Sequence, residues 1–230
     1  IIEINAAPGL RMHLYPTEGK PRKVSRDIVD MMFPKGKPFS IPIVSVTGTN
    51  GKTTTTRLIS HTLRLCGKKV GMTSTSGVYI NDTCVQKGDN TGPVSTKVVL
   101  SNKEVEAAVL EVARGGIIKR GLGYDLADVG VITNIGDDHL GLDGIDTLED
   151  LAFTKALVVE AVKPEGYAVL NAEDGMTPYI SKRIACNLVL FAKKPDNPMA
   201  AAHLKSGGRV ITLVNNEICV FDGEIRKIIT

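Results

Sequence analysis

Seven consecutive residues, Thr47 to Thr53, have the types and order needed to bind phosphate. They read Thr-Gly-Thr-Asn-Gly-Lys-Thr and lie between a β-branched run and the start of a predicted helix. Small residues let main-chain N–H groups curl around phosphate oxygens, and a helix N-terminus adds a fixed positive field. Lys52 can reach the β- and γ-phosphates of a nucleotide, and the Thr53 hydroxyl can ligate Mg²⁺. The motif therefore predicts a site for ATP and magnesium.

The loop departs in one position from the strict pattern G-x-x-x-x-G-K-[ST]. That pattern requires glycine at position 46, where this chain has Val46, and Gly48 lies inside the loop instead. The alternative, a glycine-rich turn with an incidental Lys-Thr pair, does not explain why strand, loop and helix follow in this order. The residues predicted to contact the nucleotide here are Gly48, Thr49, Asn50, Gly51, Lys52, Thr53 and Thr54.

Glu111 is the first candidate magnesium ligand outside this loop. It follows Val109 and Leu110 at the predicted end of a buried strand, and open α/β sheets bind ligands at such strand ends. A carboxylate is a hard oxygen donor that suits Mg²⁺; a surface carboxylate at the start of a loop is the alternative. The run Thr73–Thr75 offers a hydroxyl as a further ligand, which we assign to Ser74.

Lys155 lies in the middle of an apolar helical stripe. The stripe consists of Leu148, Leu151, Ala152, Val158, Val159 and Val162, in a predicted helix that the capping pair Thr147 and Asp150 opens. A lysine that points into a core is costly unless it is paired or modified, which indicates an active-site role. The alternative is a lysine whose stem lies along an apolar surface, since Phe153 and Leu157 make the other face apolar too.

The elements that must position these residues alternate between strand and helix. The predicted strands are Ile41–Val46, Lys69–Thr73, Ala107–Val112, Val129–Asn134, Tyr167–Asn171 and Leu188–Phe191. The predicted helices are Thr53–Cys66, Leu148–Val162 and Thr177–Ala185. Strands separated by crossover helices predict an α/β, P-loop NTPase-like fold with a mainly parallel sheet flanked by helices.

Both ends of the chain differ from this pattern. Residues 1–40 are punctuated by proline and glycine and predict a connector with a short helix at Ser25–Met32. Near the other end, three strand-like runs are separated by short polar turns, which predicts an extension of antiparallel hairpins at the edge of the sheet. These runs are Arg209–Val214, Glu217–Phe221 and Ile225–Ile229.

Composition excludes several classes of function. The net charge is +3, and the basic residues are scattered, so no nucleic-acid partner is expected. Apolar runs such as Val129–Ile132 are too short to span a bilayer, so no membrane association is expected. The four cysteines form no CxxC pair, which is typical of free thiols in a reducing compartment and predicts a cytoplasmic protein.

Several motifs together resemble the Mur ligase family. The loop Gly48–Thr53 has that family's shifted glycine, Thr133–Leu140 resembles its T-N-[IV]-x-x-D-H-L segment, and Leu170–Asp174 resembles its L-N-x-D-D segment. The resemblance implies that His139 is a second magnesium ligand, and that Asp138 orients it. It places Lys155 at the family's active-site lysine, which is carbamylated in several members, and Glu111 at the magnesium glutamate. It also implies contacts from Asn171 and Asp174 to adenine or ribose.

Three longer segments resemble the family members that join arginine to an aspartate polymer. These segments are Gly88–Pro93, Ala113–Ile117 and Leu140–Asp150. Asp89 and Thr91 in the first of these glycine-rich segments are candidate substrate contacts. Arg114 and Arg120, set among glycines, are candidates to steady the acyl phosphate or the peptide substrate, and solvated loop arginines are the alternative.

Residues 7–13 resemble the end of an ATP-grasp region, and this resemblance implies a domain organisation. Residues 1–40 are expected to be a connector from a preceding ATP-grasp domain, and residues 41–230 the Mur ligase central domain. The C-terminal Mur domain is expected to be missing. Those two further domains of the same parent chain are the expected protein partners, and the sequence leaves the oligomeric state open, homo-oligomers included.

The resemblance also implies a reaction. A side-chain carboxylate of the polymer attacks the γ-phosphate of ATP to give an acyl phosphate, and the arginine α-amine then displaces phosphate. Lys52, His139 and Lys155 are the implied catalytic residues, and the isolated chain is expected to be inactive. The alternatives are another Mur-type peptide or polyglutamate ligase, a non-catalytic ATP-binding module, and a P-loop switch or nucleic-acid motor.

Overall fold

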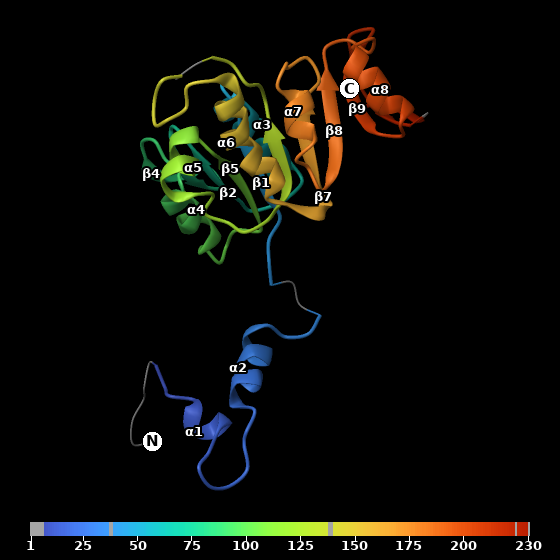
Figure 1. Cartoon of the computed structure of the whole chain (residues 1–230). Helices are drawn as coiled ribbons and strands as arrows, with labels where there is room; N and C mark the ends of the chain where they lie inside the picture. Colours follow the sequence, from blue (N-terminus) through green and yellow to red (C-terminus); the bar gives the residue numbers. More distant parts are fainter. Residues whose placement is uncertain (1–6, 37–38, 138–139, 224, 230) are drawn as a thin grey trace. The chain divides into compact units, whose positions relative to one another are not determined.

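The chain divides into two compact units, residues 1–40 and 41–230. The computed structural model describes residues 7–36, 39–137, 140–223 and 225–229 (Figure 1). The first unit contains helix α1 at Arg11–Leu14 and helix α2 at Val24–Met32. Helix α2 confirms the short helix predicted at Ser25–Met32, and no side chain on either helix is buried.

The described part of the second unit is built on one eleven-stranded sheet. Its strand order is β11-β10-β9-β8-β7-β6-β1-β5-β2-β3-β4. The strands are β1 Ile43–Thr47, β2 Val70–Ser74, β3 Gly77–Ile80, β4 Thr83–Lys87, β5 Ala107–Glu111, β6 Ala127–Ile132, β7 Val162–Asn171, β8 Asn187–Ala192, β9 Arg209–Val214, β10 Glu217–Asp222 and β11 Ile225–Ile228. The strands from β2 to β9 in this order pair in parallel.

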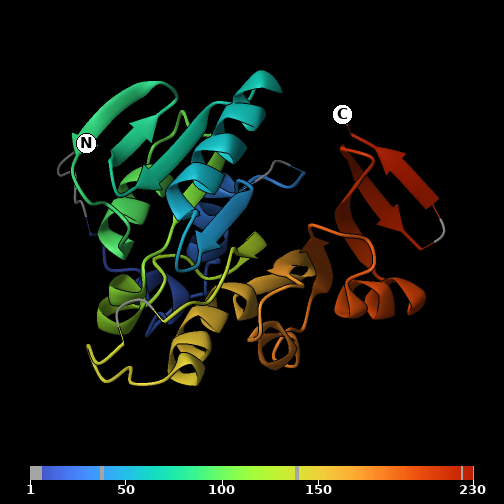
Figure 2. The same ribbon diagram turned by 90° about the horizontal axis from the view of Figure 1, so that it is seen from above.

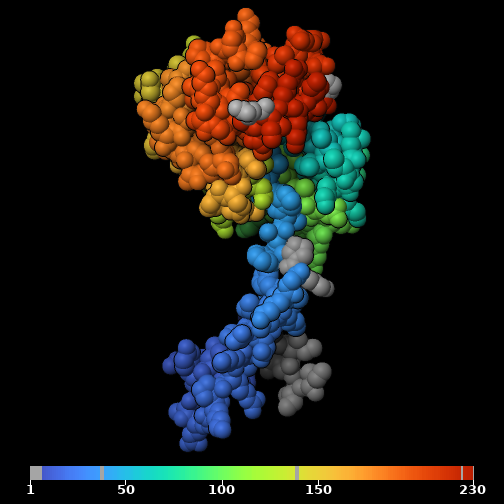
Figure 3. All heavy atoms as spheres, turned by 90° about the vertical axis from the view of Figure 1, so that its right-hand side faces the viewer, coloured from blue at the N-terminus to red at the C-terminus, as the bar shows by residue number. Residues whose placement is uncertain are grey.

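Antiparallel strands extend the sheet at both ends, as Figure 2 shows from above. The C-terminal strands β9, β10 and β11 form the predicted hairpin extension. In Figure 3 these strands, in red, lie on the face of the second unit that is turned to the viewer, next to the preceding part of the chain in orange. The α/β fold with a mainly parallel sheet and an antiparallel extension is therefore confirmed.

Helices cover the two faces of the sheet. They are α3 Lys52–Leu65, α4 Pro93–Leu100, α5 Arg114–Arg120, α6 Leu148–Glu160, α7 Thr177–Ser181 and α8 Pro198–Lys205. Strand β5 shows how the faces divide, because its side chains alternate. Val109 packs with Ile59 and Leu63 of α3, whereas Leu110 packs with Val99 of α4 on the opposite face. No helix of the described residues is long and apolar enough to cross a bilayer.

Helix α6 begins where the capping pair predicts. The Thr147 hydroxyl accepts a hydrogen bond from the Asp150 N–H at 3.1 Å, and the Asp150 carboxylate accepts one from the Thr147 N–H at 3.0 Å. The hydrogen bonds from Thr147 lower the pKa of Asp150 below its usual range. Ala152, Ala156 and Val159 of this helix are buried against β6, β7 and β8. The cap and this packing fix the side of α6 that faces the sheet.

Some predicted bounds are wrong, and some elements were not predicted. The strand predicted at Val129–Asn134 ends at Ile132, and the helix predicted at Thr177–Ala185 ends at Ser181. The sequence did not predict β3, β4, α4, α5 or α8. Strand β4 is exposed throughout, so it carries no apolar alternation, and the glycine pair in α5 weakens its helical pattern.

Tyr124 connects the packing under α4 and α5, and its ionisation gives a test of the fold. Its hydroxyl donates a hydrogen bond to the Ser45 Oγ at 2.7 Å, and burial raises the pKa of Tyr124 to about 12. An unfolded tyrosine titrates near pH 10. Between these two values the unfolded chain releases a proton that the folded chain keeps, so stability falls as pH rises.

We expect Tyr124→Phe to change this pH dependence. At pH 8 the variant should be less stable by about 1 kcal/mol, because Ser45 loses its partner. At pH 11 the two proteins should be equally stable within about 0.5 kcal/mol, because only the wild-type protein loses stability through this tyrosine. Urea unfolding at both pH values measures the gap. Tyr15→Phe, at a side chain that is 79% exposed, is the control, and a gap that stays constant with pH would contradict the assignment.

Candidate active site

Most of the predicted site residues that the structure describes lie at one edge of the sheet. Parallel pairing places Val46 of β1 opposite Glu111 of β5, and Thr47 opposite Ile132 of β6. The loops that follow these strands therefore lie side by side at the carboxyl ends of the strands, where ligands bind in open α/β sheets.

The loop at residues 47–51 turns sharply at two glycines. Gly48 has φ +144° and Gly51 has φ +84°, and Gly51 is the N-cap of α3. A Cβ atom on Gly48 would lie 1.9 Å from the Oγ1 of Thr133, so only glycine fits there. The loop is therefore shaped by its close approach to the segment after β6.

Asn134 holds two amides of this loop. The Thr49 N–H donates to the Asn134 main-chain oxygen, and the Asn50 N–H donates to the Asn134 Oδ1, both at 2.9 Å. The first N–H groups of α3 have no carbonyl one turn earlier to bond, and they are the donors left to meet a phosphate. The amides of Thr49 and Asn50 are therefore already hydrogen-bonded within the protein. The predicted contacts of the loop residues with the nucleotide stay predictions.

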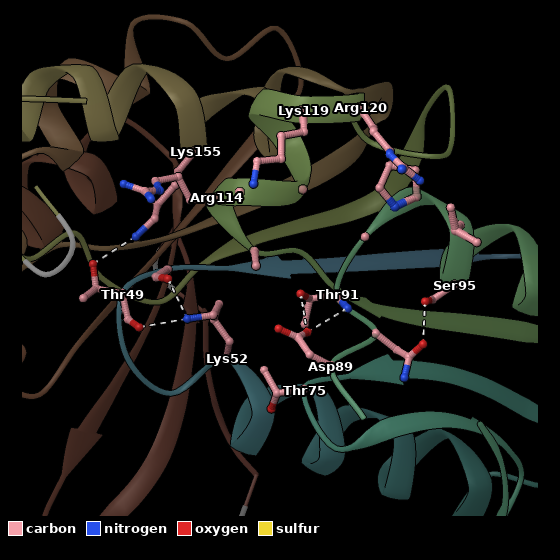
Figure 4. Close-up of a pocket in the computed structure, with 18 of the residues that line it drawn as sticks. Thr49, Lys52, Thr75, Asp89, Thr91, Ser95, Arg114, Lys119, Arg120 and Lys155 are labelled. Carbon is pink, nitrogen blue, oxygen red and sulfur yellow. Dashed lines mark hydrogen bonds between the residues drawn. The ribbon is translucent and has the colours of Figure 1, made fainter. Parts of the chain in front are cut away.

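Lys52 lies over the loop. Its ammonium group donates hydrogen bonds to the main-chain oxygens of Gly48 at 3.1 Å and Thr49 at 2.9 Å (Figure 4). Both acceptors are neutral carbonyls, and a phosphate oxygen is a stronger acceptor because it is charged. A bound nucleotide would therefore compete well for this ammonium group.

Lys155 points inward, as its place in the apolar stripe predicts. The side chain is buried, and its Nζ donates to the Oγ1 of Thr49 at 2.9 Å. The same hydroxyl accepts from the Gly136 N–H at 2.8 Å. The alternative of a lysine lying along the outer surface is therefore wrong. Thr49 brings both lysines to one residue, Lys52 at its carbonyl and Lys155 at its hydroxyl (Figure 4).

Glu111 is buried among hydroxyl groups. Its Oε1 accepts from the Thr53 hydroxyl at 3.1 Å, and its Oε2 accepts from the Thr75 N–H at 3.2 Å. The Thr53 and Thr75 hydroxyls are also 3.1 Å apart. These three side chains supply hard oxygen donors, which fit a magnesium ion. In the part of the chain that the structure describes, no group of three or more His, Cys, Asp or Glu side chains could hold a metal.

The predicted metal ligand Ser74 does not face Glu111. Its hydroxyl lies 2.9 Å from the Ser76 Oγ and donates to the Gly77 oxygen, so it points away from the carboxylate. The structure places Thr75 there instead, because the turn from β2 to β3 begins at this point. Asp138 and His139 lie outside the described residues, and their role in metal binding stays a prediction.

Asn171 and Asp174 also form hydrogen bonds with the segment that follows β6. The Asn171 Nδ2 donates to the Thr133 oxygen at 3.3 Å, and the Asp174 carboxylate accepts from the Ile135 N–H. The predicted contacts of these two residues with adenine or ribose stay predictions. In the structure they support the same segment that holds the phosphate loop.

A cavity of about 790 Å³ opens beside Lys52, and the four predicted substrate residues line it. The Asp89 Oδ1 accepts from the Thr91 hydroxyl at 2.8 Å. The Arg114 guanidinium donates to the Asp143 carboxylate at 3.2 Å, and Arg120 is exposed.

The sequence analysis gave no role to Lys119 or Asn134, and within the run Thr73–Thr75 it chose Ser74 where the structure places Thr75. Asn134 belongs to the motif at Thr133–Leu140, but no role followed from its residue type. Its spatial neighbours, Thr49 and Asn50, are 84 or more residues away in the chain.

Comparison with known proteins agrees with this geometry. The family model for the Mur ligase middle domain matches residues 46–225. A cyanophycin synthetase from Synechocystis sp. is 49% identical over 223 residues, which is 97% of this chain and 26% of the relative. A UDP-N-acetylmuramoyl-L-alanyl-D-glutamate–2,6-diaminopimelate ligase from Bacillus cereus is 31% identical over 78% of this chain and 39% of the relative.

Comparison with solved structures shows a similar fold. The solved structure of a UDP-N-acetylmuramoyl-L-alanyl-D-glutamate–2,6-diaminopimelate ligase aligns with a TM-score of 0.64 at 19% identity. The alignment covers 83% of this chain and 39% of that one. The chain spans about a quarter of the length of the cyanophycin synthetases that it matches.

Gly48→Ala tests the close contact between the loop and Thr133. The added methyl group would collide with the Thr133 hydroxyl, so the loop must shift and its amides lose their alignment. We expect Mg-ATP to bind at least about tenfold more weakly, which calorimetry measures. Gly175→Ala is the matched control, because no atom lies within 4 Å of the position that its added methyl group would occupy. Equal affinity in Gly48→Ala and the wild-type protein would contradict this account of the loop.

Proposed function

Because the chain belongs to the Mur ligase family, we propose that it is the ATP-binding domain of an amide ligase of the cyanophycin synthetase type. It activates the side-chain carboxylate of an aspartate polymer as an acyl phosphate, and the α-amine of arginine then attacks that acyl phosphate. ATP is the phosphate donor, and Mg²⁺ is the required metal.

One observation carries this proposal. The phosphate loop, the buried carboxylate of Glu111 and a cavity lined by several cations share one edge of the sheet. A reaction between ATP and a carboxylate brings two anionic groups together, so positioning and charge neutralisation are its main needs. The cavity lies next to Lys52, where the γ-phosphate would be, and it leaves room for an acceptor.

Each of the site residues has a separate role in this proposal. Lys52 leaves the carbonyls of Gly48 and Thr49 and binds the terminal phosphates. Glu111, Thr53 and Thr75 provide the oxygen ligands, and the bound magnesium would neutralise phosphate charge as the bond breaks. Lys155, held by Thr49, lines the cavity and offers a positive charge to the carboxylate that reacts.

We also propose that the chain acts as part of a larger protein. Residues 1–40 would connect an ATP-grasp domain to the Mur ligase central domain at residues 41–230. A C-terminal Mur domain of the same protein would then close over the nucleotide, so we expect no product from the isolated chain.

Two alternatives compete with this proposal. Another Mur-type peptide or polyglutamate ligase would use the same ATP site with a different acceptor. The identity of 31% to the 2,6-diaminopimelate ligase supports this alternative less strongly than the identity of 49% to a cyanophycin synthetase supports the proposal. A non-catalytic ATP-binding module would not need a buried carboxylate next to the Thr53 hydroxyl. A substrate screen with aspartate polymer, glutamate polymer and muramyl peptides decides between the acceptors.

Lys52→Ala tests the site. We expect its affinity for Mg-ATP to fall at least about tenfold in calorimetry, because the ammonium group no longer binds the phosphates. In the full-length protein that contains this chain, ATP-dependent incorporation of radiolabelled arginine into aspartate polymer should fall at least about 100-fold. Lys182→Ala removes an exposed lysine outside the cavity and should change neither value. Wild-type activity in Lys52→Ala would remove Lys52 from the mechanism.

A further inference from the structure

A second cavity, of about 660 Å³, lies between helix α3 and the hairpin of β2 and β3. Its volume is in the range of small-molecule sites. Met72 and Tyr79 of the hairpin line it, and both belong to the apolar cluster formed with α3. Its described lining residues and those of the cavity beside the phosphate loop have no member in common. Apart from Thr53 and Thr54 at one end, this lining has no role in the proposed reaction.

Three basic side chains of α3 line the second cavity at helical spacing. Arg57, His61 and Arg64 follow one another at intervals of four and three residues, so they lie on one face of the helix. Among the described lining residues the one carboxylate is that of Asp82, which forms an ion pair with Arg64. Arg57 has no carboxylate partner within the part of the chain that the structure describes. The positive charge of Arg57 is therefore left uncompensated beside the cavity.

A hydrogen bond to a neutral group holds the Arg57 side chain in place. Its guanidinium donates to the Ser76 Oγ at 2.8 Å. The Ser76 hydroxyl is itself 2.9 Å from the Ser74 Oγ, and it accepts from the Tyr79 hydroxyl at 3.5 Å. A hydroxyl orients a guanidinium without neutralising it, and a guanidinium has further N–H groups for a second acceptor. Because the side chain is already ordered, binding an anion costs less conformational entropy here than at a mobile surface arginine.

Apolar surface lies beside this cation. Leu58, the next residue in the chain, lines the cavity and is 62% exposed. The side chains of Met72 and Tyr79 line the cavity as well. Binding sites for small molecules combine such apolar surface with a few oriented polar groups. The combination suits an organic anion whose charged group contacts the guanidinium and whose apolar part covers Leu58.

We propose that the cavity between α3 and the β2–β3 hairpin binds a small organic anion. Arg57 binds its phosphate or carboxylate group, and Leu58 and Tyr79 contact its apolar part. Guanidinium groups bind both kinds of oxyanion through charge-assisted and often bidentate hydrogen bonds. The site goes beyond the proposed function, because it binds its ligand whether or not the chain is part of a ligase.

The cavity continues well past the phosphate loop. It begins at Thr53 and Thr54 and extends to Arg64, roughly 16 Å further along α3 at 1.5 Å per residue. Arg57 lies one turn beyond Thr53, and its guanidinium bonds to the turn between β2 and β3 rather than to the loop. An experiment must therefore distinguish an anion bound at Arg57 from one bound at the phosphate loop.

Phenyl phosphate is a probe with the required charge and apolar part. Its titration into the ¹⁵N-labelled chain should give saturable NMR shifts of the backbone amides of Arg57 and Tyr79. We expect Arg57→Gln to weaken this binding at least about tenfold, because the guanidinium is lost. Arg26→Gln is the matched control, at an exposed arginine of α2 that is paired with Asp30, and it should change binding less than about twofold. Equal affinity in Arg57→Gln and the wild-type protein, or no saturable binding by the wild-type protein, would overturn the proposal.

Lys52→Ala separates this site from the phosphate loop. Lys52 does not line the second cavity, so the affinity read from the same two amides should stay within about twofold of wild type. A loss of about tenfold in Lys52→Ala, with no loss in Arg57→Gln, would assign the anion to the phosphate loop and refute the proposal.

Leu58→Ser tests the apolar contact independently of Arg57. Because Leu58 is already exposed, the melting temperature should stay within error of wild type. Binding of phenyl phosphate should weaken at least about threefold, whereas binding of inorganic phosphate should stay within about twofold. Equal changes for the two anions would contradict the apolar contact.

Benzoate has the same ring as phenyl phosphate and a carboxylate in place of the phosphate. Comparison of the two probes therefore identifies the class of ligand: tighter binding of phenyl phosphate assigns a phosphate ester, and tighter binding of benzoate assigns a carboxylate. Both results support the anion site, and saturable binding of neither probe at Arg57 would overturn it.

Discussion

The hydrogen bonds between the phosphate loop and the segment after β6 are the constraint on which the whole site depends. Asn134 binds the amides of Thr49 and Asn50, and the Thr133 hydroxyl donates to the Asn50 oxygen at 2.6 Å. Asn171 and Asp174 form further hydrogen bonds that stabilise this segment. The loop therefore does not fold by its own sequence alone: its shape is fixed by residues more than eighty positions away. The Thr49 hydroxyl then positions Lys155, because it accepts hydrogen bonds from both that lysine and the Gly136 N–H.

The arrangement separates charge across the site. The acidic group, Glu111, lies with the Thr53 and Thr75 hydroxyls toward β2 and β5, where a cation would be bound. Lys52, Arg114, Lys119, Arg120 and Lys155 line the cavity together with the single carboxylate of Asp89, and anions would be bound there. Parallel strands place the loops that follow them at one edge of the sheet. The position of each charged residue along that edge is set by the strand that it follows, and this produces the separation of charge. Two negatively charged reactants can then approach each other with their charges compensated from different sides.

Much of the fold and of the candidate site could be predicted from the sequence, wherever the residues that indicate a feature are close together in the chain. The loop could be predicted because strand, glycines, Lys-Thr and helix are contiguous, and the inward direction of Lys155 because helical periodicity fixes it. The choice between Ser74 and Thr75 could not be predicted from the sequence. Neighbouring residues at a strand end point to opposite sides, and the β2–β3 turn decides which of the two faces Glu111. Strand β4 and helix α5 lack apolar periodicity, so the place of Lys119 beside the cavity became visible only in three dimensions.

A crystal structure of the chain with magnesium and a non-hydrolysable ATP analogue would test the central claim most directly. The account predicts that the γ-phosphate binds the N–H groups at the start of α3 and that the Lys52 ammonium moves from the carbonyls of Gly48 and Thr49 to a phosphate oxygen. It also predicts that Asn134 keeps its hydrogen bonds to Thr49 and Asn50. A nucleotide bound elsewhere, or a phosphate held by the amides of Thr49 and Asn50 after release from Asn134, would contradict it.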